Sequence, residues 1–154
     1  MTRHLETTVE TYPISGVFTI SRGSRTKAEV IVCSISERGV TGRGECVPYK
    51  RYGESLEGVE AQILAERDFI DDAGSRHDLL KRMKPGAARN AIDCALWDLE
   101  SKLAHVPVAR AIGAEPAKPL VTAYTLSLGE PEAMQRQADR AARIKEAKRL
   151  ALMF

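Results

Sequence analysis

The residues that most often carry catalysis or bind metals are sparse and widely separated in this 154-residue sequence. The candidate ligands and nucleophiles are three cysteines and three histidines, namely Cys33, Cys46, Cys94, His4, His77 and His105. No two cysteines form a Cys-x-x-Cys pair, and no histidine has the spacing to another ligand that helical metal motifs require. We therefore predict neither a metal centre nor a disulfide framework from these residues.

Two carboxylates, Glu45 and Asp93, have the residue type of an acid–base pair, but each also has a simpler structural interpretation. Glu45 would anchor the loop that follows its strand, and Asp93 would pair with Arg89 one helical turn away. We predict the structural role for both. On the same helical stretch as Asp93, Cys94 and Trp97 are expected in or near the core.

The overall charge argues against two classes of partner. Lys and Arg total 23 while Asp and Glu total 21, which gives a net charge of +2. A protein held on nucleic acid by phosphate charge is usually far more basic. The last five residues are the longest apolar run and are far short of the about 20 that a membrane span needs, and the N-terminus lacks the apolar core of a signal peptide. We expect a cytoplasmic protein with no nucleic-acid or membrane partner.

The first part of the chain has the periodicity of β-structure. Residues 5–11, 28–35 and 40–47 are rich in β-branched and apolar residues, and residues 5–11 alternate with period 2. Residues 14–26 are looser, with small polar side chains, and Gly39 indicates a hairpin turn. These features predict a three-stranded antiparallel meander.

Helical periodicity begins at Ser55, which we expect to be a helix N-cap. An apolar stripe runs from there to Ile70, a second helix is predicted over residues 75–83, and the clearest helix over residues 87–104. A short final turn is expected over residues 107–112. These helices would pack on the predicted sheet.

The texture changes in the proline-containing stretch 114–119. A strand is predicted over residues 120–128 and a helix opening at Pro131, which is how a parallel α/β unit begins. We therefore predict two domains, with residues 1–115 forming an α+β domain and residues 116–154 starting a β/α unit.

Four stretches, in their order and spacing, resemble the N-terminal part of dipeptide epimerases, in the muconate-lactonizing branch of the enolase superfamily. They are residues 20–26, 42–55, 86–99 and 122–125. Gly-Arg-Gly-Glu and Ala-Ile-Asp-Cys-Ala-Leu-Trp-Asp-Leu look like the whole branch. Ser-Arg-Gly-Ser-Arg-Thr and Pro-Tyr-Lys-Arg-Tyr-Gly-Glu-Ser look specifically like dipeptide epimerases.

The resemblance implies an N-terminal α+β capping domain followed by a β/α barrel, with a small dipeptide as substrate. Two mobile loops of the capping domain would close over that substrate, here residues 20–26 and 48–54. Arg25 would pair with a substrate carboxylate, and Thr125 would contact the substrate from the first barrel strand. The implied substrate-binding residues are Ile20, Arg25, Tyr52 and Thr125.

The family's reaction is a Mg²⁺-dependent 1,1-proton transfer at the α-carbon of a dipeptide such as L-Ala-L-Glu, and the resemblance implies two catalytic lysines and three metal-binding carboxylates. One lysine belongs to a Lys-x-Lys motif that should fall near residues 150–152, where the sequence reads Leu-Ala-Leu. Lys145 and Lys148 have a different spacing, and a whole barrel takes about 250 residues. We therefore expect an incomplete barrel, no catalytic residue or metal ligand in this chain, and no epimerisation by the chain alone.

Two alternatives stay open at this point. The first is a muconate cycloisomerase or o-succinylbenzoate synthase relative, against which the two loop stretches argue, and the second is a non-enzymatic, degenerate fragment. The basic residues after Pro131 are interpreted as the solvated face of an exterior helix. Because an incomplete barrel exposes the edge of the strand over residues 120–128, we also expect self-association, or a homo-oligomer, through residues 119–154.

Overall fold

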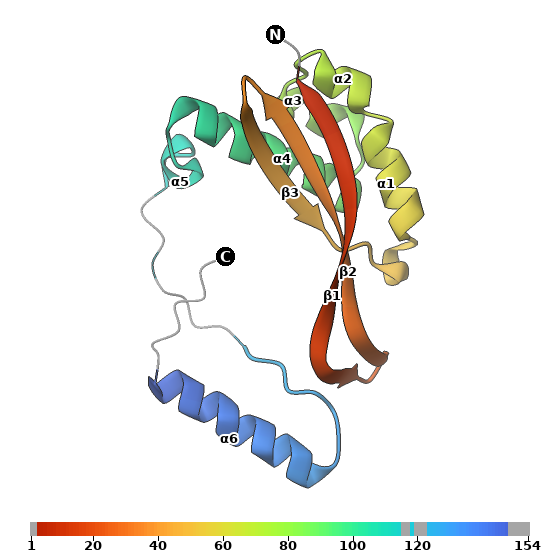
Figure 1. Ribbon diagram of the computed structural model, residues 1–154, viewed down its shortest axis with the longest axis vertical. Coiled ribbons are helices and arrows are strands. Elements are labelled where there is room, and N and C mark those ends of the chain that lie inside the picture. The colour runs from red at the N-terminus through yellow and green to blue at the C-terminus, as the bar shows by residue number, and fades with distance from the viewer. Residues whose placement is uncertain (1–2, 115–117, 119–122, 148–154) are drawn as a thin grey trace. The chain divides into compact units, whose positions relative to one another are not determined.

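The computed structural model describes residues 3–114, residue 118 and residues 123–147 (Figure 1). The chain divides into two compact units. The first unit comprises residues 1–11 and 29–115, and the second comprises residues 12–28 and 116–154. Strands β1 and β2 therefore contribute residues to both units.

Three strands form one sheet in the order β1-β2-β3, as the meander prediction required. They are β1 (His4–Ile20), β2 (Gly23–Glu37) and β3 (Val40–Cys46). Strands β2 and β3 pair antiparallel, with Glu37 opposite Val40. Between them Arg38 and Gly39 both have positive φ, 53° and 76°. Two positive φ angles are what a tight two-residue hairpin turn demands, and Gly39 adopts its angle without steric cost.

Strands β1 and β2 are longer than predicted. Residues 14–26 were expected to be loose, but β1 continues through Pro13 and Gly16 to Ile20, and β2 begins at Gly23. Strand β1 lies at the edge of the sheet, so no strand of this sheet pairs with its outer side. On that side the missing N–H of Pro13 therefore removes no hydrogen bond to another strand. The small polar residues of this stretch concealed an extended hairpin, so the predicted loop is the tip of that hairpin.

Helices follow the sheet in the first unit and match most of the prediction. They are η1 (Lys50–Tyr52), α1 (Leu56–Leu64), α2 (Arg67–Asp71), α3 (Arg76–Arg82), α4 (Ala87–Ala104) and α5 (Val108–Ala111). Ser55 caps α1 by accepting a hydrogen bond from the Gly58 amide at 3.0 Å, and Ser75 caps α3 by accepting one from the Asp78 amide at 3.1 Å.

One predicted helix is two. The stripe from Ser55 to Ile70 is interrupted between α1 and α2, where the Glu66 amide donates to the carbonyl of Ile63 at 3.1 Å and closes a tight turn. Both Ile63 and Ile70 are completely buried. The apolar periodicity therefore continues across the break and could not reveal it.

The core of the first unit lies between the sheet and the helices, with α4 running along strand β3 (Figure 1). Two glycines of β3 make this close approach feasible. A Cβ atom on Gly42 would lie 2.2 Å from the carbonyl oxygen of Ala95, and one on Gly44 would lie 2.0 Å from that of Ala91. Because neither glycine has a side chain, the backbone of β3 can lie directly against the backbone of α4.

The two α4 side chains expected near the core differ in exposure. Cys94 is exposed, which corrects that prediction. Trp97 is half-buried, and the Arg76 guanidinium lies 3.3 Å from the centroid of its ring. Arg76 also bonds to Glu100 at 2.8 Å, so this face of α4 is covered by a charged side chain rather than by the core.

The second unit contains the hairpin of residues 12–28, the segment 123–130 and helix α6 (Pro131–Ala147). The helix opens at Pro131 as predicted. The predicted strand over residues 120–128 is not found where it can be checked, because residues 123–128 form no strand and residues 120–122 lie outside the described part. The Ser127 amide donates to the side chain of Gln137 at 2.9 Å, which removes it from any strand ladder.

Candidate functional site

The structure distributes the four sequence-predicted site residues over the two units. Ile20, Arg25 and Thr125 belong to the second unit, and Tyr52 belongs to the first. Arg25 and Thr125 are exposed, Ile20 is half-buried, and Tyr52 is 76% exposed.

Arg25 stands just beyond the tip of the hairpin that β1 and β2 form. The turn is at residues 21 and 22, and Gly23 follows with φ +138°, a conformation that side-chain-bearing residues rarely adopt. The Thr19 and Ser24 hydroxyl oxygens lie 2.9 Å apart and tie the two strands together next to the turn. The following residue, Arg25, has an exposed side chain.

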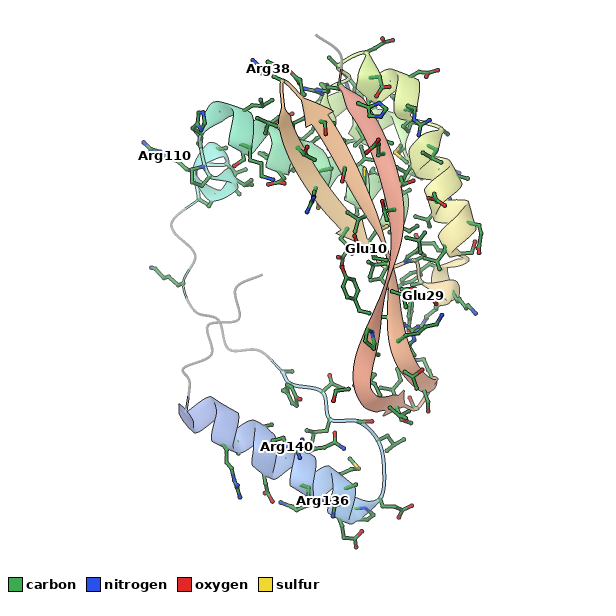
Figure 2. The ribbon with its side chains drawn as sticks, in the orientation of Figure 1. Glu10, Glu29, Arg38, Arg110, Arg136 and Arg140 are labelled. Atoms are coloured by element: carbon green, nitrogen blue, oxygen red, sulfur yellow. The ribbon has the colours of Figure 1, made fainter. Side chains whose placement is uncertain are left out.

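Thr125 lies beside this hairpin on the segment that precedes α6. The Leu128 amide donates to the carbonyl of Thr19 at 2.8 Å, which joins the segment to β1. A cavity of about 480 Å³ opens between them, lined by residues of β1, by Thr125 and by Gln137 and Arg140 of α6. Figure 2 shows Arg140 and Arg136 on this helix. The cavity combines hydroxyl, amide and guanidinium groups, which suit a polar or anionic ligand.

The loop after β3, in the first unit, is anchored by Glu54. One carboxylate oxygen accepts a hydrogen bond from the Tyr49 amide at 2.9 Å, and the other accepts one from the Ala87 amide at 2.8 Å. The N-cap of α4 is Gly86, which has no side chain, so Glu54 serves the free amide and the positive end of this helix instead. Glu45 was predicted to anchor this loop, but its side chain is exposed, and Glu54 is the residue that anchors the loop.

Tyr52 lies on the anchored loop. Its ring centroid is 5.6 Å from that of Tyr49, with a tilt of 55°, and Gly53 closes the turn with φ +75°. Both rings line a cavity of about 390 Å³, together with residues at the end of β3 and the start of α4. Packing of the tyrosines on each other leaves the Tyr52 ring presented to solvent.

Asp93 does not make the predicted pairing. Its Oδ1 atom is buried and has no hydrogen-bond partner among the described residues, while Arg89 donates to the carbonyl of Met83 at 3.4 Å. An orphaned buried oxygen is unusual in a folded domain. The role of Asp93 is therefore not the helical ion pair that its spacing to Arg89 indicated.

None of the three thiols is activated. Burial, and secondarily the charge of Cys46, raises the pKa of Cys33 to about 12. Burial, and then the charges of Glu54 and Glu45, raises the pKa of Cys46 to about 11. Burial followed by the nearby Asp93 also raises the pKa of Cys94. All three stay protonated at neutral pH, which is the state least suited to nucleophilic chemistry.

The described residues do not fit a magnesium site. Within residues 3–114, 118 and 123–147, no group of three or more His, Cys, Asp or Glu side chains could hold a metal ion. Mg²⁺ prefers several oxygen ligands in near-octahedral geometry. The carboxylates of this part of the chain therefore do not form the ligand set that Mg²⁺ requires. Nor is any helix in the described part long and apolar enough to cross a membrane.

Comparison with known families matches residues 3–113 to the mandelate racemase / muconate lactonizing enzyme N-terminal domain. The chain belongs to this family, and the resemblance to enolase-superfamily capping domains is confirmed. The three-stranded sheet with its covering helices is the fold that the resemblance implied.

Individual relatives show which enzymes of this family the chain is similar to. The chain is 42% identical to the L-Ala-D/L-Glu epimerase of Escherichia coli K12 over 129 residues, which are 84% of this chain and 40% of that enzyme. It is 52% identical to a solved enolase family member from Agrobacterium tumefaciens with homology to dipeptide epimerases, with a TM-score of 0.86 over 92% of this chain and 44% of that one. That structure holds sodium and L-Ala-L-Glu, with an ordered loop.

A dipeptide epimerase from Cytophaga hutchinsonii, solved with Mg and D-Ala-L-Val, is 25% identical, with a TM-score of 0.75 over 93% of this chain and 42% of that one. The present chain thus spans less than half of the length of each of these relatives. Named epimerases among them are isomerases, and Mg is bound in one of them.

Sequence reasoning missed the side chains that hold the site in place. Glu54 has no role that the sequence predicts, because its partner Ala87 is 33 positions away and no local pattern indicates such a bond. Ser127 and Gln137 were not singled out, since serine and glutamine are common on any surface. A polar residue next to a predicted site residue, as Ser127 is to Thr125, is the one signal that could have found them.

Proposed function

We propose that this chain supplies the substrate-covering part of a dipeptide epimerase that acts on a dipeptide ending in an acidic residue, such as L-Ala-L-Glu. The observation that carries the proposal is the hairpin tip, where an ordered turn presents the exposed side chain of Arg25. A guanidinium group offers a planar fork of N–H donors that matches a carboxylate. The segment with Thr125 joins the same hairpin and would supply a hydroxyl to the substrate.

The chemistry assigns these residues to binding rather than to proton transfer. Epimerisation removes a weakly acidic proton next to a carbonyl group and returns it on the other face, and enolase-type sites use bound Mg²⁺ and a lysine or histidine base for this step. In the proposed enzyme the metal and the bases belong outside the described residues. Arg25, Ile20, Thr125 and Tyr52 would orient the dipeptide and exclude water around it.

A chimeric enzyme tests this proposal directly. In it, the residues of this chain replace the matching N-terminal residues of the Escherichia coli L-Ala-D/L-Glu epimerase. We expect the chimera with Mg²⁺ to exchange deuterium into the α-position of L-Ala-L-Glu, followed by NMR. The 154-residue chain alone should give no exchange above a no-protein control. A folded chimera that exchanges nothing would refute the proposed function.

The carboxylate role of Arg25 has its own test in this chimera. A charge-assisted hydrogen bond contributes roughly 1.5–3 kcal/mol, so Arg25→Ala should lower kcat/KM for L-Ala-L-Glu by about 10- to 150-fold. L-Ala-L-Leu should change much less, and Arg25→Lys should recover part of the loss. The matched control is Arg22→Ala, which removes an exposed arginine from the same turn. Equal losses for both dipeptides would mean that Arg25 orders the hairpin instead of reading the substrate.

A further inference from the structure

One hydroxyl group, that of Ser127, makes two hydrogen bonds to the backbone of strand β1. It accepts from the Thr19 amide at 2.9 Å and donates to the carbonyl of Val17 at 3.0 Å. A serine hydroxyl has a single proton to donate and lone pairs to accept with. Both capacities are therefore used on one strand, next to the backbone bond from Leu128 to Thr19.

Gln137 of helix α6 holds the same serine from the other side. Its carbonyl oxygen Oε1 accepts from the Ser127 amide at 2.9 Å, and its Nε2 donates to the Ser127 carbonyl at 3.3 Å. The side-chain amide thus takes the place of a neighbouring strand's backbone. We name the pair the Ser127–Gln137 clasp.

The clasp connects to each predicted substrate residue of the second unit. Thr125 is two residues before Ser127, and Ile20 directly follows Thr19. The Thr19 hydroxyl lies 2.9 Å from that of Ser24, and Arg25 directly follows Ser24. A continuous line of hydrogen bonds therefore runs from α6 through Ser127 to the tip of the hairpin.

Apolar packing contributes less here than it does in the first unit. Among the described residues of the second unit, no hydrophobic side chain is buried. Three of the four bonds of the clasp are half-buried, and hydrogen bonds in such surroundings are directional. The clasp, together with the backbone bond from Leu128 to Thr19, therefore fixes the hairpin against the segment with Thr125.

Resting on the proposed function, we propose that Ser127 and Gln137 are positioning residues for dipeptide recognition. They touch no reacting atom. They set the distance between the hairpin tip, which carries Ile20 and Arg25, and the hydroxyl of Thr125. A ligand held at both ends is bound productively when this distance is fixed, and loses orientation when it varies.

The distance can be measured on the full chain without any ligand. Nitroxide labels are attached through Thr26→Cys and Tyr124→Cys, both exposed positions, in a Cys94→Ser background. Cys33 and Cys46 are buried thiols that stay unlabelled at neutral pH. Dipolar electron paramagnetic resonance then gives the distance distribution, and amide exchange of Thr19 and Leu128 gives the local opening.

We expect Ser127→Ala and Gln137→Met each to broaden the distance distribution and to speed exchange of the two amides by about 5- to 10-fold. Ser127→Thr, which keeps a hydroxyl, should restore the narrow distribution. Gln135→Met is the matched control, because Gln135 is an exposed residue of α6 that bonds to Asp139 of the same helix. Amides of α4 report whether the first unit stays folded.

Unchanged distributions in Ser127→Ala and Gln137→Met, or equal broadening in Gln135→Met, would overturn the proposal. The result is independent of turnover. A distance that depends on the clasp together with an inactive chimera refutes the proposed function and leaves the clasp in place. An active chimera, together with a distance that does not change in the clasp variants, refutes the positioning role of the clasp and leaves the proposed function in place.

Discussion

Each of the two units is stabilised internally by a different kind of interaction. Every buried hydrophobic side chain among the described residues lies in the first unit, on strands β1, β2 and β3 or on helices α1, α2, α3 and α4. In the second unit the described side chains are exposed or half-buried, and Ser127 and Gln137 make hydrogen bonds that join the hairpin, the segment 123–130 and helix α6.

The two kinds of interaction have different consequences for stability and for geometry. Burial of apolar surface is non-directional and stabilises a unit by about 25 cal/mol for each Å² removed from water. Hydrogen bonds add less net stability but fix distances and angles. The first unit is therefore a packed scaffold, which also carries Tyr52, while hydrogen bonds fix the parts of the second unit that carry Ile20, Arg25 and Thr125.

The largest expected effect comes from adding one methyl group under helix α4. Gly44→Ala would bring a Cβ atom within 2.0 Å of the Ala91 carbonyl oxygen, a backbone atom that cannot move aside alone. We expect the free energy of unfolding of the first unit to fall by about 3 kcal/mol or more, measured by urea denaturation. The matched change in the second unit is Gly129→Ala, whose Cβ atom would meet its nearest neighbour at 4.0 Å. Equal losses for the two variants would remove the distinction between the units.

A smaller effect is expected where the first unit depends on polar bonds. Glu54→Ala removes the acceptor for two backbone amides, one in the loop with Tyr52 and one at the start of α4. We expect a loss of about 2 kcal/mol in thermal or urea unfolding, and a change in Tyr52 fluorescence as the loop loosens. Glu45→Ala is the control, because the sequence favoured that exposed residue for the same role. Similar losses from both would restore the sequence-based assignment.

The two units also differ in how far the sequence predicted them. The bounds of α4 and the caps Ser55 and Ser75 followed from periodicity and capping chemistry, because both are local. The extent of β1 did not, since its small polar residues carry little apolar alternation. The anchoring role of Glu54 and the clasp depend on bonds between residues far apart in the chain, which no spacing rule records.

For the site itself, the family motifs placed Arg25, Ile20, Tyr52 and Thr125 on the chain, and the structure shows what surrounds each. Their contacts with a dipeptide stay predictions. The expected self-association through residues 119–154 also stays a prediction, because much of that stretch lies outside the described residues.

The smallest expected effect concerns an ion pair at the end of the sheet. It tests how much a charged pair adds to the stability that apolar burial gives the first unit. Arg3 Nε lies 2.9 Å from Glu37 Oε2, and Arg3 also donates to the carbonyl of Gly74 at 2.9 Å. The hydrogen bond from Arg3 has the largest effect and lowers the pKa of Glu37. Burial opposes it, and the charges of Arg3 and Arg38 and a hydrogen bond from Arg38 lower the pKa further. A carboxyl group whose pKa is lower in the folded state stabilises that state above its unfolded pKa. The contribution is lost as the pH falls through the folded pKa.

We therefore expect Glu37→Gln to reduce the unfolding free energy by about 1 kcal/mol at neutral pH, because the amide oxygen still accepts from Arg3 and only the charge is lost. Below the folded pKa of Glu37 the variant and the parent should converge, because the parent's carboxyl is then neutral as well. Urea titrations at a series of pH values between neutrality and acid measure this difference. Glu57→Gln, on the exposed first turn of α1, controls for charge removal. A difference that persists unchanged in acid would show that the glutamate acts through packing instead of through its charge, and would count Glu37 among the residues that stabilise the first unit by burial.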